Sequence, residues 1–567
     1  MSSPSKKTLS VDTVSLIVSV GLFVFTARWF TRTERQRREL GLWGARKNIP
    51  SHGGGATGNS RTHQNNAANQ GSVAEGAIGS RGLVALDTPR VAYLEDFMYC
   101  LHNACDHIRN PTGHIGMCVA ENKLILDVLA ERLMQIGTAT AAFSDSTVYC
   151  YNSFLGLPVA RDAVAYFLAK RFLLSDDVVE PEVALQHIQP HHVAMASGCA
   201  AVLHYLFFIL GEQGECCLIP APYYAAFDSD MKSLAGIEPF GFQMANATLG
   251  PTEQDLNLAY IEAMSKGLTP RFVLLTNPNN PLGVVYKPQV LRDTIQWARK
   301  RNLHTIVDEI HALSTHGANP FGQQQQHISS SKQQQHTQRG SQSSYPPHHN
   351  LSGLQGNSNN NHDGSFQSVI KVLNNELGND VHMVWALSKD FGASGLRVGV
   401  LYSQNENFMR ALLASNISIF SCVSGPIQYV VSELLTDDAF IDQFLEESQE
   451  RLRRSYEICV LKLEEMVVPF VPAEAGLFVY VDFSSLLPQK TFEWERKLSE
   501  LMFTHARIVL TPGETMKERT PGNFRICYAW VSCEVLEIAM ERLSRLIGKV
   551  RRMDWSDLDE RTLVGIL

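Results

Sequence analysis

The sequence predicts an α/β fold built on a mostly parallel sheet. Short apolar runs alternate with segments of helical pattern, and polar or Gly-rich residues follow the runs. This alternation is typical of parallel sheets, in which ligands bind where the strands end. The 567 residues, 44% of them hydrophobic, suffice for a sizeable core and for more than one domain.

The candidate strands are short and apolar. The first covers residues 193–196 and precedes a helical pattern over Cys199–Leu210. Four further candidates have the same character, at residues 216–219, 272–275, 305–307 and 383–386. Most of the polar motifs described below follow one of these runs directly, which places them at one edge of the predicted sheet.

Charge and cysteine content limit the partners. The net charge of −8 argues against a nucleic-acid-binding surface. The eleven cysteines show no metal-ligand spacing, and the one tight pair, Cys216-Cys217, is too close to bridge easily. We therefore expect reduced thiols in a reducing compartment, no metal and no nucleic acid.

The N-terminal segment resembles a membrane anchor. Residues 8–27 are uncharged apart from Asp12, close to the ~20 residues that span a bilayer. Basic residues dominate residues 28–47, so the positive-inside bias predicts a single-pass anchor at 8–30, with the bulk of the chain facing the cytosol. A cleaved signal peptide would need an Ala-x-Ala site, and a transit peptide would be less continuously apolar.

Two low-complexity tracts interrupt the chain. Residues 31–83 form a predicted flexible linker, rich in Gly, Asn, Ser and Gln from residue 51. Residues 322–364 carry runs of Gln and Asn, which cannot bury enough apolar surface to fold. We expect this insert to be a disordered surface loop within a globular region of residues 84–567.

One lysine lies in a loop after the last candidate strand. Ser388-Lys389-Asp390-Phe391-Gly392 opens this Gly-rich loop, and Arg397 follows eight residues after Lys389. A lone lysine there would usually be solvated surface, but a converging Lys and Arg suit pyridoxal 5′-phosphate (PLP). PLP chemistry requires a lysine amine, a phosphate cradle, an acid at the pyridine nitrogen and a cation for the substrate carboxylate.

Two further motifs could complete such a site. Asp308 ends the apolar run at 305–307, where a buried carboxylate needs a cation such as a protonated pyridine nitrogen. Its alternative role is a helix N-cap. Asn280 lies in a rigid Asn-Pro turn after residues 272–275, and could bond the cofactor's 3′-oxygen or serve the turn alone.

Three motifs remain. The small residues Gly198, Cys199 and Ala200 lie between a strand and a helix, where backbone N–H groups suit a phosphate, or where small residues serve packing. Tyr224 could stack on the pyridine ring or be a core aromatic. Arg525, within an apolar run, suits a substrate α-carboxylate or an internal salt bridge.

With these motifs the chain resembles the class I/II (fold type I) PLP-dependent aminotransferases, over roughly residues 85–547 without the insert. Within them it is most similar to the 1-aminocyclopropane-1-carboxylate (ACC) synthase-like branch. The segments that carry the branch resemblance are 113–123 (GHIGMCVAENK), 156–158 (GLP), 222–228 (PYYAAFD) and 475–478 (AGLF).

The resemblance implies a fold and a set of roles. We expect a large domain at about 151–415, a smaller α/β domain from 84–150 and 416–567, and a homodimer. Lys389 would form the Schiff base with PLP and move the α-proton of an amino-acid substrate. Asp308 would pair with the pyridine nitrogen, Asn280 would bond the 3′-oxygen, and Tyr224 would stack on the ring. Arg397 and the Gly198–Ala200 amides would hold the phosphate, and Ser388 would contact the cofactor. Arg525 would bind the substrate α-carboxylate, and Glu121 would lie near the substrate.

Four positions depart from the family pattern. Phe154 replaces a Tyr that reaches toward the partner's site, and His311 replaces a Tyr near the 3′-oxygen, which an imidazole could still bond. Ala200 and Ala386 replace hydroxyl residues of the phosphate site. Each lost donor is expected to weaken cofactor retention by ~1 kcal/mol.

Three functions follow from these observations. The first is an aminotransferase or related lyase acting on an α-amino acid, and the second is a true ACC synthase acting on S-adenosylmethionine. The third is a membrane-anchored PLP-fold protein with little turnover. Phe154 and His311 weigh against the second. Five intact residues weigh against the third: Lys389, Asp308, Asn280, Arg397 and Arg525.

Overall fold

The computed structural model describes residues 79, 92–174, 180–316, 366–417 and 422–552. The predicted anchor at 8–30, nearly all of the linker and the Gln/Asn-rich insert lie outside these residues. Within the described ranges no helix combines the length and the apolar character needed to cross a bilayer.

A seven-stranded sheet forms the larger layer of the fold, in the order β2-β8-β7-β6-β5-β3-β4. Only β8 runs antiparallel to its two neighbours, so the sheet is mostly parallel, as predicted. The strands are β2 (Val193–Ser197), β3 (Glu215–Ala221), β4 (Glu238–Gln243), β5 (Thr269–Thr276), β6 (His304–Asp308), β7 (Val381–Ala386) and β8 (Val398–Ser403).

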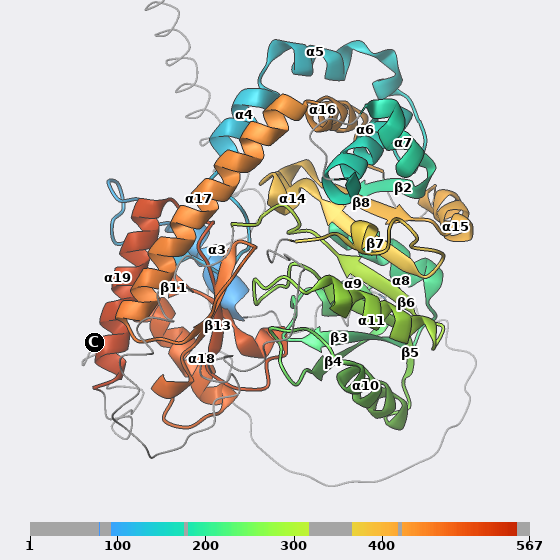
Figure 1. Ribbon diagram of the computed structural model, residues 1–567. Helices are drawn as coiled ribbons and strands as arrows, with labels where there is room; N and C mark the ends of the chain where they lie inside the picture. Colours follow the sequence, from blue (N-terminus) through green and yellow to red (C-terminus); the bar gives the residue numbers. More distant parts are fainter. Residues whose placement is uncertain (1–78, 80–91, 175–179, 317–365, 418–421, 553–567) are drawn as a thin grey trace, which may run out of the picture. The chain divides into compact units, whose positions relative to one another are not determined.

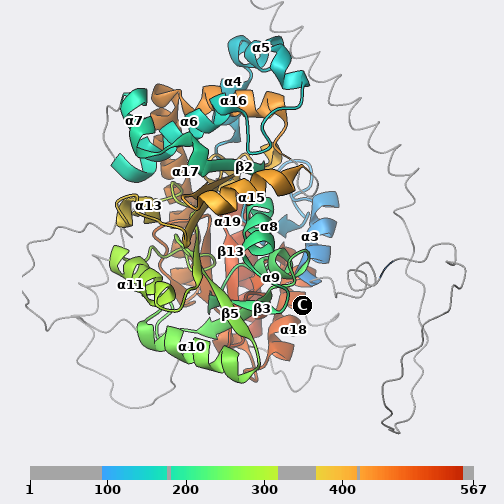
Figure 2. The same cartoon turned by 90° about the vertical axis from the view of Figure 1, so that its right-hand side faces the viewer.

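Both faces of this sheet are covered, which explains the continuous apolar runs in its strands. Along β5, Phe272 and Leu274 pack in the core beneath α8, whereas Val273 and Leu275 pack on the opposite side with α11 (Figure 2). The helices around the sheet are α6 (Pro158–Leu168), α7 (Pro181–His187), α8 (Cys199–Leu210), α9 (Phe227–Lys232), α10 (Glu253–Ser265), α11 (Pro288–Arg299), α13 (Val369–Val372), α14 (Leu387–Asp390) and α15 (Glu406–Asn416).

Local sequence signals set several helix ends. Helix α8 begins directly after Gly198 and covers the residues that the pattern predicted. Thr252 and Asp255 form a reciprocal capping box at the start of α10, which satisfies two backbone donors there. Prolines occupy the first turn of α6 and α11, where their missing N–H is not needed.

A second, antiparallel sheet has the order β12-β13-β10-β9. A short parallel pair, β1 with β11, joins residues 115–116 to residues 508–509, which are far apart in the sequence. The strands are β1 (Ile115–Gly116), β9 (Phe470–Val471), β10 (Phe478–Asp482), β11 (Ile508–Val509), β12 (Thr511–Pro512) and β13 (Asn523–Cys527).

The long helix α17 (Asp438–Glu465) connects the two cores (Figure 1). Ile441 and Phe444 pack into the core of the seven-stranded sheet, and Tyr456 and Leu463 pack into that of the smaller sheet. The other helices are α3 (Ala92–His102), α4 (Leu126–Leu133), α5 (Ile136–Ser144), α16 (Gly425–Leu435), α18 (Phe492–Leu501) and α19 (Cys533–Val550). The predicted boundaries between a large and a small domain stay a prediction.

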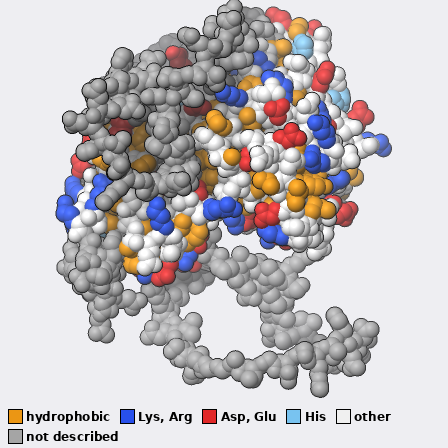
Figure 3. Space-filling view, turned by 60° about the horizontal axis from the view of Figure 1, so that its bottom comes forward, with side chains coloured by type: hydrophobic (Ala, Val, Ile, Leu, Met, Phe, Trp, Pro, Cys, Tyr) orange, Lys and Arg blue, Asp and Glu red, His pale blue; other side chains and the backbone are white. Residues whose placement is uncertain are grey.

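The surface carries charges of both signs. On the face drawn in Figure 3, Lys and Arg side chains are interspersed with Asp and Glu.

Candidate active site

Most of the predicted cofactor residues follow the carboxyl ends of neighbouring strands. Strand β5 ends just before Asn277, β6 ends at Asp308, and β7 leads directly into α14, which carries Lys389. Because β5, β6 and β7 are parallel, these three positions meet at one edge of the sheet. The smaller sheet adds Arg525 from β13.

Lys389 lies among groups that favour its neutral amine. Its Nζ donates a hydrogen bond to the carbonyl oxygen of Ala120. Burial lowers the pKa of Lys389, and the positive charge of Arg525 lowers it further, while Glu121 opposes them. A neutral amine is the nucleophilic form, so this environment suits a lysine that attaches a carbonyl compound.

Asp308 is a buried carboxyl group with a raised pKa. The side chain is 4% exposed, and its Oδ1 accepts a hydrogen bond from the backbone N–H of Ile310 at 3.2 Å. Burial raises the pKa of Asp308 to about 7, and the Asp230 carboxylate acts in the same direction. No helix begins at Asp308, so the structure does not give it the alternative N-cap role.

His311 is a buried imidazole without hydrogen-bond partners. It is 1% exposed, and neither ring nitrogen bonds any described residue. Its ring packs edge-on against Phe478, with 5.3 Å between the centroids. Burial, then Lys389 and Arg525, hold the pKa of His311 well below its usual value, so the ring is neutral. Two buried, unused nitrogens are costly and indicate a ligand position.

Arg525 is 3% exposed and donates to neutral oxygens only. Its Nη1 donates to Asn280 Oδ1 at 2.7 Å, and its Nη2 donates to the Cys118 carbonyl at 2.7 Å and to Thr511 Oγ1 at 3.3 Å. Its Nε has no partner, and no carboxylate among the described residues pairs with it. The alternative of an internal salt bridge is therefore not found in the described part of the chain.

The predicted phosphate loop is shaped by a glycine. Gly198 has a φ of 85°, and a Cβ there would collide with the guanidinium of Arg397. Arg397 Nη2 donates to the Ser197 carbonyl at 3.2 Å, which holds the guanidinium beside the start of α8. The first amides of α8, at Cys199 and Ala200, have no intrahelical acceptors and remain available to an anion.

The two adjacent tyrosines have different environments. Tyr223 is 2% exposed and donates to Asp228 Oδ1 at 2.7 Å, so it is the core aromatic. Tyr224 is 40% exposed and packs edge-on against Phe227 at 5.3 Å. Burial and then the Asp230 carboxylate raise the pKa of Tyr224, and the charge of Arg525 opposes them.

The other predicted residues have fewer described contacts with the residues above. Ser388 is buried in α14 beside Lys389. Glu121 accepts a hydrogen bond from Ser394 Oγ and acts electrostatically on Lys389. The carbonyl of Phe154 accepts a hydrogen bond from Asn416 Nδ2 at 2.6 Å, and no described contact joins Phe154 to the cluster.

Sequence reasoning missed three residues near the cluster. Asn277 is fully buried, and its Nδ2 has no partner among the described residues. Asp230 of α9 acts on Asp308 and Tyr224. Burial raises the pKa of Tyr93 in α3, and the charge of Arg525 opposes this shift. Asn277 could have been found in the same Asn-Pro motif, whereas no local signal identifies Tyr93.

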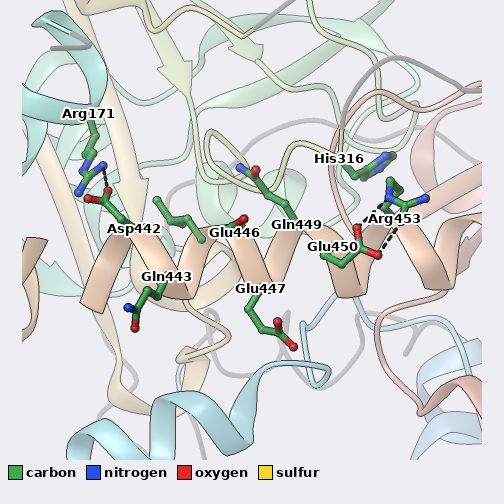
Figure 4. A pocket seen from close by; sticks show the side chains of 10 residues that line it. Arg171, His316, Asp442, Gln443, Glu446, Glu447, Gln449, Glu450 and Arg453 are labelled. Atoms are coloured by element: carbon green, nitrogen blue, oxygen red, sulfur yellow. Dashed lines mark hydrogen bonds and ion pairs between the residues drawn. The ribbon is translucent and has the colours of Figure 1, made fainter. Parts of the chain in front are cut away.

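A groove in the described region lies apart from this cluster. It has a volume of about 930 Å³ and runs along α17, between Arg171 and His316 (Figure 4). Its charged walls are paired internally, by Arg171 with Asp442 at 2.5 Å and by Arg453 with Glu450 at 2.6 Å. None of the predicted cofactor residues lines it, so we place the site at the sheet edge.

The residues at the sheet edge fit PLP. Lys389 has a lowered pKa, which suits reaction of its amine with the aldehyde of PLP. The loop at Gly198, beside Arg397, suits the phosphate of PLP, and the buried Asp308 suits its protonated pyridine nitrogen. The unpartnered atoms of His311 and Arg525 leave donors for the cofactor and a substrate carboxylate. Among the described residues, no cluster of three or more His, Cys, Asp or Glu is arranged for a metal ion.

Sequence comparisons point to the same chemistry. The chain is 31% identical over 458 residues to 1-aminocyclopropane-1-carboxylate synthase 9 of Arabidopsis thaliana, covering 78% of this chain and 85% of that protein. It is 28% identical over 460 residues to the 1-aminocyclopropane-1-carboxylate synthase of Nicotiana tabacum, covering 79% and 82%. The chain is therefore related to ACC synthases.

Solved structures share the fold. An aspartate aminotransferase double mutant of Thermus thermophilus matches with a TM-score of 0.59 at 17% identity, covering 83% of this chain and 99% of that one. An aromatic aminotransferase of Pyrococcus horikoshii matches with a TM-score of 0.56 at 20% identity, covering 78% and 97%. Residues 115–543 match the family described as aminotransferase class I and II. The chain belongs to this family of PLP-dependent enzymes, and it has their fold type I architecture.

Proposed function

We propose that this protein binds PLP through Lys389 and transfers the amino group of an α-amino acid. The observation that carries the proposal is Arg525, a buried cation that has no acidic partner among the described residues and lies within the electrostatic reach of Lys389. A planar guanidinium in this state suits the α-carboxylate of an amino acid, which would supply the missing negative charge.

PLP supplies an electron sink that allows a bond at the substrate Cα to break. Around it, Asp308 would hold a positive charge at the pyridine nitrogen, and the amides of Cys199 and Ala200, with Arg397, would hold the phosphate. Asn280 and Arg525 share a hydrogen bond, which fixes the orientation of the guanidinium that receives the carboxylate.

Lys389 would also carry the substrate's α-proton. Burial and the charge of Arg525 lower its pKa, which favours an amine that could accept and return this proton. Burial keeps His311 neutral, and it would donate one ring N–H toward the cofactor's 3′-oxygen. Tyr224 would stack on the pyridine ring.

Absorption spectroscopy of the purified full-length chain tests this function. We expect a visible band of bound PLP, and conversion of that band to the pyridoxamine form by at least one member of a panel of α-amino acids. A protein with no visible band after incubation with PLP would contradict the proposal.

A second candidate is ACC synthesis from S-adenosylmethionine. The 31% identity to an ACC synthase over 78% of the chain favours it, while Phe154 and His311 alter hydroxyl groups that the family usually carries. Release of methylthioadenosine from S-adenosylmethionine, without pyridoxamine formation, would favour this reaction over transamination.

We also propose that the protein is a homodimer attached to a membrane, with its catalytic region in the cytosol. Exposed apolar side chains on α3, at Leu94, Met98 and Leu101, support a dimer. The apolar residues 8–30 and the basic residues after them support the anchor. Sedimentation analysis in detergent would test the dimer, and carbonate extraction of membranes would test the anchor.

A further inference from the structure

Ser394 lies in the loop between Lys389 and Arg397 and contacts functional groups on both sides. It opens a short 3₁₀ turn, Ser394–Leu396. Its carbonyl oxygen accepts a hydrogen bond from Arg397 Nη1 at 3.0 Å. Its hydroxyl donates to Oε1 of Glu121, which is 273 positions away in the sequence.

The segment around Glu121 lies directly against the lysine loop. Lys389 Nζ donates to the carbonyl of Ala120, the residue before Glu121. On the other side, a Cβ built on Gly392 would come within 2.6 Å of the carbonyl oxygen of Asn122. Glu121 is therefore flanked by two residues that contact the loop, and its carboxylate is within electrostatic reach of the Lys389 amine.

Lys389 and Glu121 form hydrogen bonds with different partners. Lys389 bonds the backbone of Ala120, and the Glu121 carboxylate bonds Ser394. Glu121 nevertheless acts on the amine and favours its protonated form. A carboxylate released from Ser394 would be attracted to that ammonium group, because the half-buried setting weakens screening by water.

We propose that Ser394 is a positioning residue: its hydroxyl holds the Glu121 carboxylate away from the Lys389 amine, so that this amine remains free to attach the cofactor. The inference rests on the proposed function, because it concerns the attachment of PLP to Lys389. Attachment joins the neutral Nζ to the aldehyde carbon of PLP, forms a C=N bond and releases one water molecule.

Other charged or titratable groups also face Lys389, and they set the background for any pH dependence. They come from several elements: Arg525 and Cys527 from β13, Cys199 from α8, Asp308 from β6, and His311 from the turn after β6. A change at Ser394 leaves all of these in place and alters the position of Glu121.

The test is the rate of PLP attachment to the full-length apoprotein, followed by rapid-mixing absorption between pH 6 and pH 10. We expect Ser394→Ala to raise the pH midpoint of attachment by about one unit, and to slow attachment near neutral pH about tenfold, because one pKa unit is a tenfold change in neutral amine. Ser394→Thr retains the hydroxyl and should restore the wild-type profile.

Two further variants separate this role from a structural one. Adding Glu121→Gln to Ser394→Ala should return the profile to that of Glu121→Gln alone, because the competing charge is gone. Ser265→Ala, which removes an exposed hydroxyl bonded to the Glu262 carbonyl at 2.7 Å, should leave the profile unchanged. Unfolding temperatures of all variants show whether each protein is folded.

The results distinguish two failures. If wild-type protein attaches PLP and folded Ser394→Ala has the same rate and pH midpoint, the positioning role is wrong and the proposed function stands. The same conclusion follows if the double variant is as slow as Ser394→Ala. If the wild-type protein attaches no PLP, the proposed function fails and the inference fails with it.

Discussion

The guanidinium of Arg525 donates to the side-chain oxygen of Asn280 over 2.7 Å, although 245 positions separate them in the sequence. This bond joins the smaller sheet to the turn after β5 of the larger one. It orients a buried cation that has no acidic partner among the described residues. We propose that this guanidinium receives the carboxylate of a substrate.

Arg525→Lys should weaken amino-acid binding and leave PLP attachment intact. A lysine keeps the charge but loses the planar pair of donors and the orientation given by Asn280. We expect KM for the best amino acid to rise by a factor equivalent to roughly 1.5–3 kcal/mol, the range for losing a hydrogen bond to a charged group. Steady-state kinetics with the visible PLP band as a control would measure it; an unchanged KM contradicts the role.

Gly198→Ala should lower the affinity for PLP. The added Cβ would collide with Arg397 and would also strain the backbone, whose φ is 85°. Gly267→Ala is the matched control, because Gly267 has a φ of 76° but open space around a Cβ. Fluorescence titration of the apoproteins with PLP should show a weaker affinity for Gly198→Ala than for Gly267→Ala; equal affinities would contradict the phosphate-loop role.

His311→Phe should stabilise the apoprotein and reduce its stabilisation by PLP. The substitution removes two buried nitrogens that have no partner among the described residues, each of which costs about 1–3 kcal/mol when unsatisfied. The same nitrogens are the ones we expect PLP to use. Thermal unfolding with and without PLP would measure both effects, and a PLP-induced shift equal to that of the wild type would argue against this contact.

Glu309 should make the apoprotein less stable as the pH rises. Burial raises its pKa from 4.5 to about 8. Between pH 4.5 and pH 8, Glu309 is therefore protonated in the folded state and ionised in the unfolded state. Its contribution to stability is present below pH 4.5 and declines as the pH rises to 8. Relative to wild type, Glu309→Gln should gain roughly 3 kcal/mol in unfolding free energy between pH 5.5 and 8.5.

Urea unfolding of both apoproteins at these two pH values checks the prediction. Glu309 accepts hydrogen bonds from Ser368 Oγ and from the N–H of Val369, both at 2.6 Å, so Gln keeps one acceptor and most of the packing. A stability difference that does not change with pH would show that Glu309 is ionised in the folded protein.

Local patterns predicted the elements well where burial is strong. The strands β5, β6 and β7 and helix α8 contain the predicted runs, since residues buried on both faces must be apolar throughout. The antiparallel direction of β8 was not predicted, because strand direction depends on the path of the chain rather than on local composition. The lysine, aspartate and arginine of the proposed site were candidates because each follows, ends or interrupts an apolar run.

Contacts between distant segments could not be read from the sequence. Three such relationships depend on how the chain folds as a whole. They are the hydrogen bond of Ser394 to Glu121, that of Arg525 to Asn280, and the electrostatic effect of Arg525 on Tyr93. Asn277 was passed over because its neighbour Asn280 had already been assigned a role. The predicted membrane anchor and the Gln/Asn-rich insert lie outside the described residues and stay predictions.

Reductive trapping tests the central claim most directly. The full-length protein, incubated with PLP and reduced with borohydride, should carry a phosphopyridoxyl group on the peptide that contains Lys389, and Lys389→Ala should carry none at this position. A protein that gains no such mass, or gains it on a different lysine while Lys389 stays unmodified, would contradict the account.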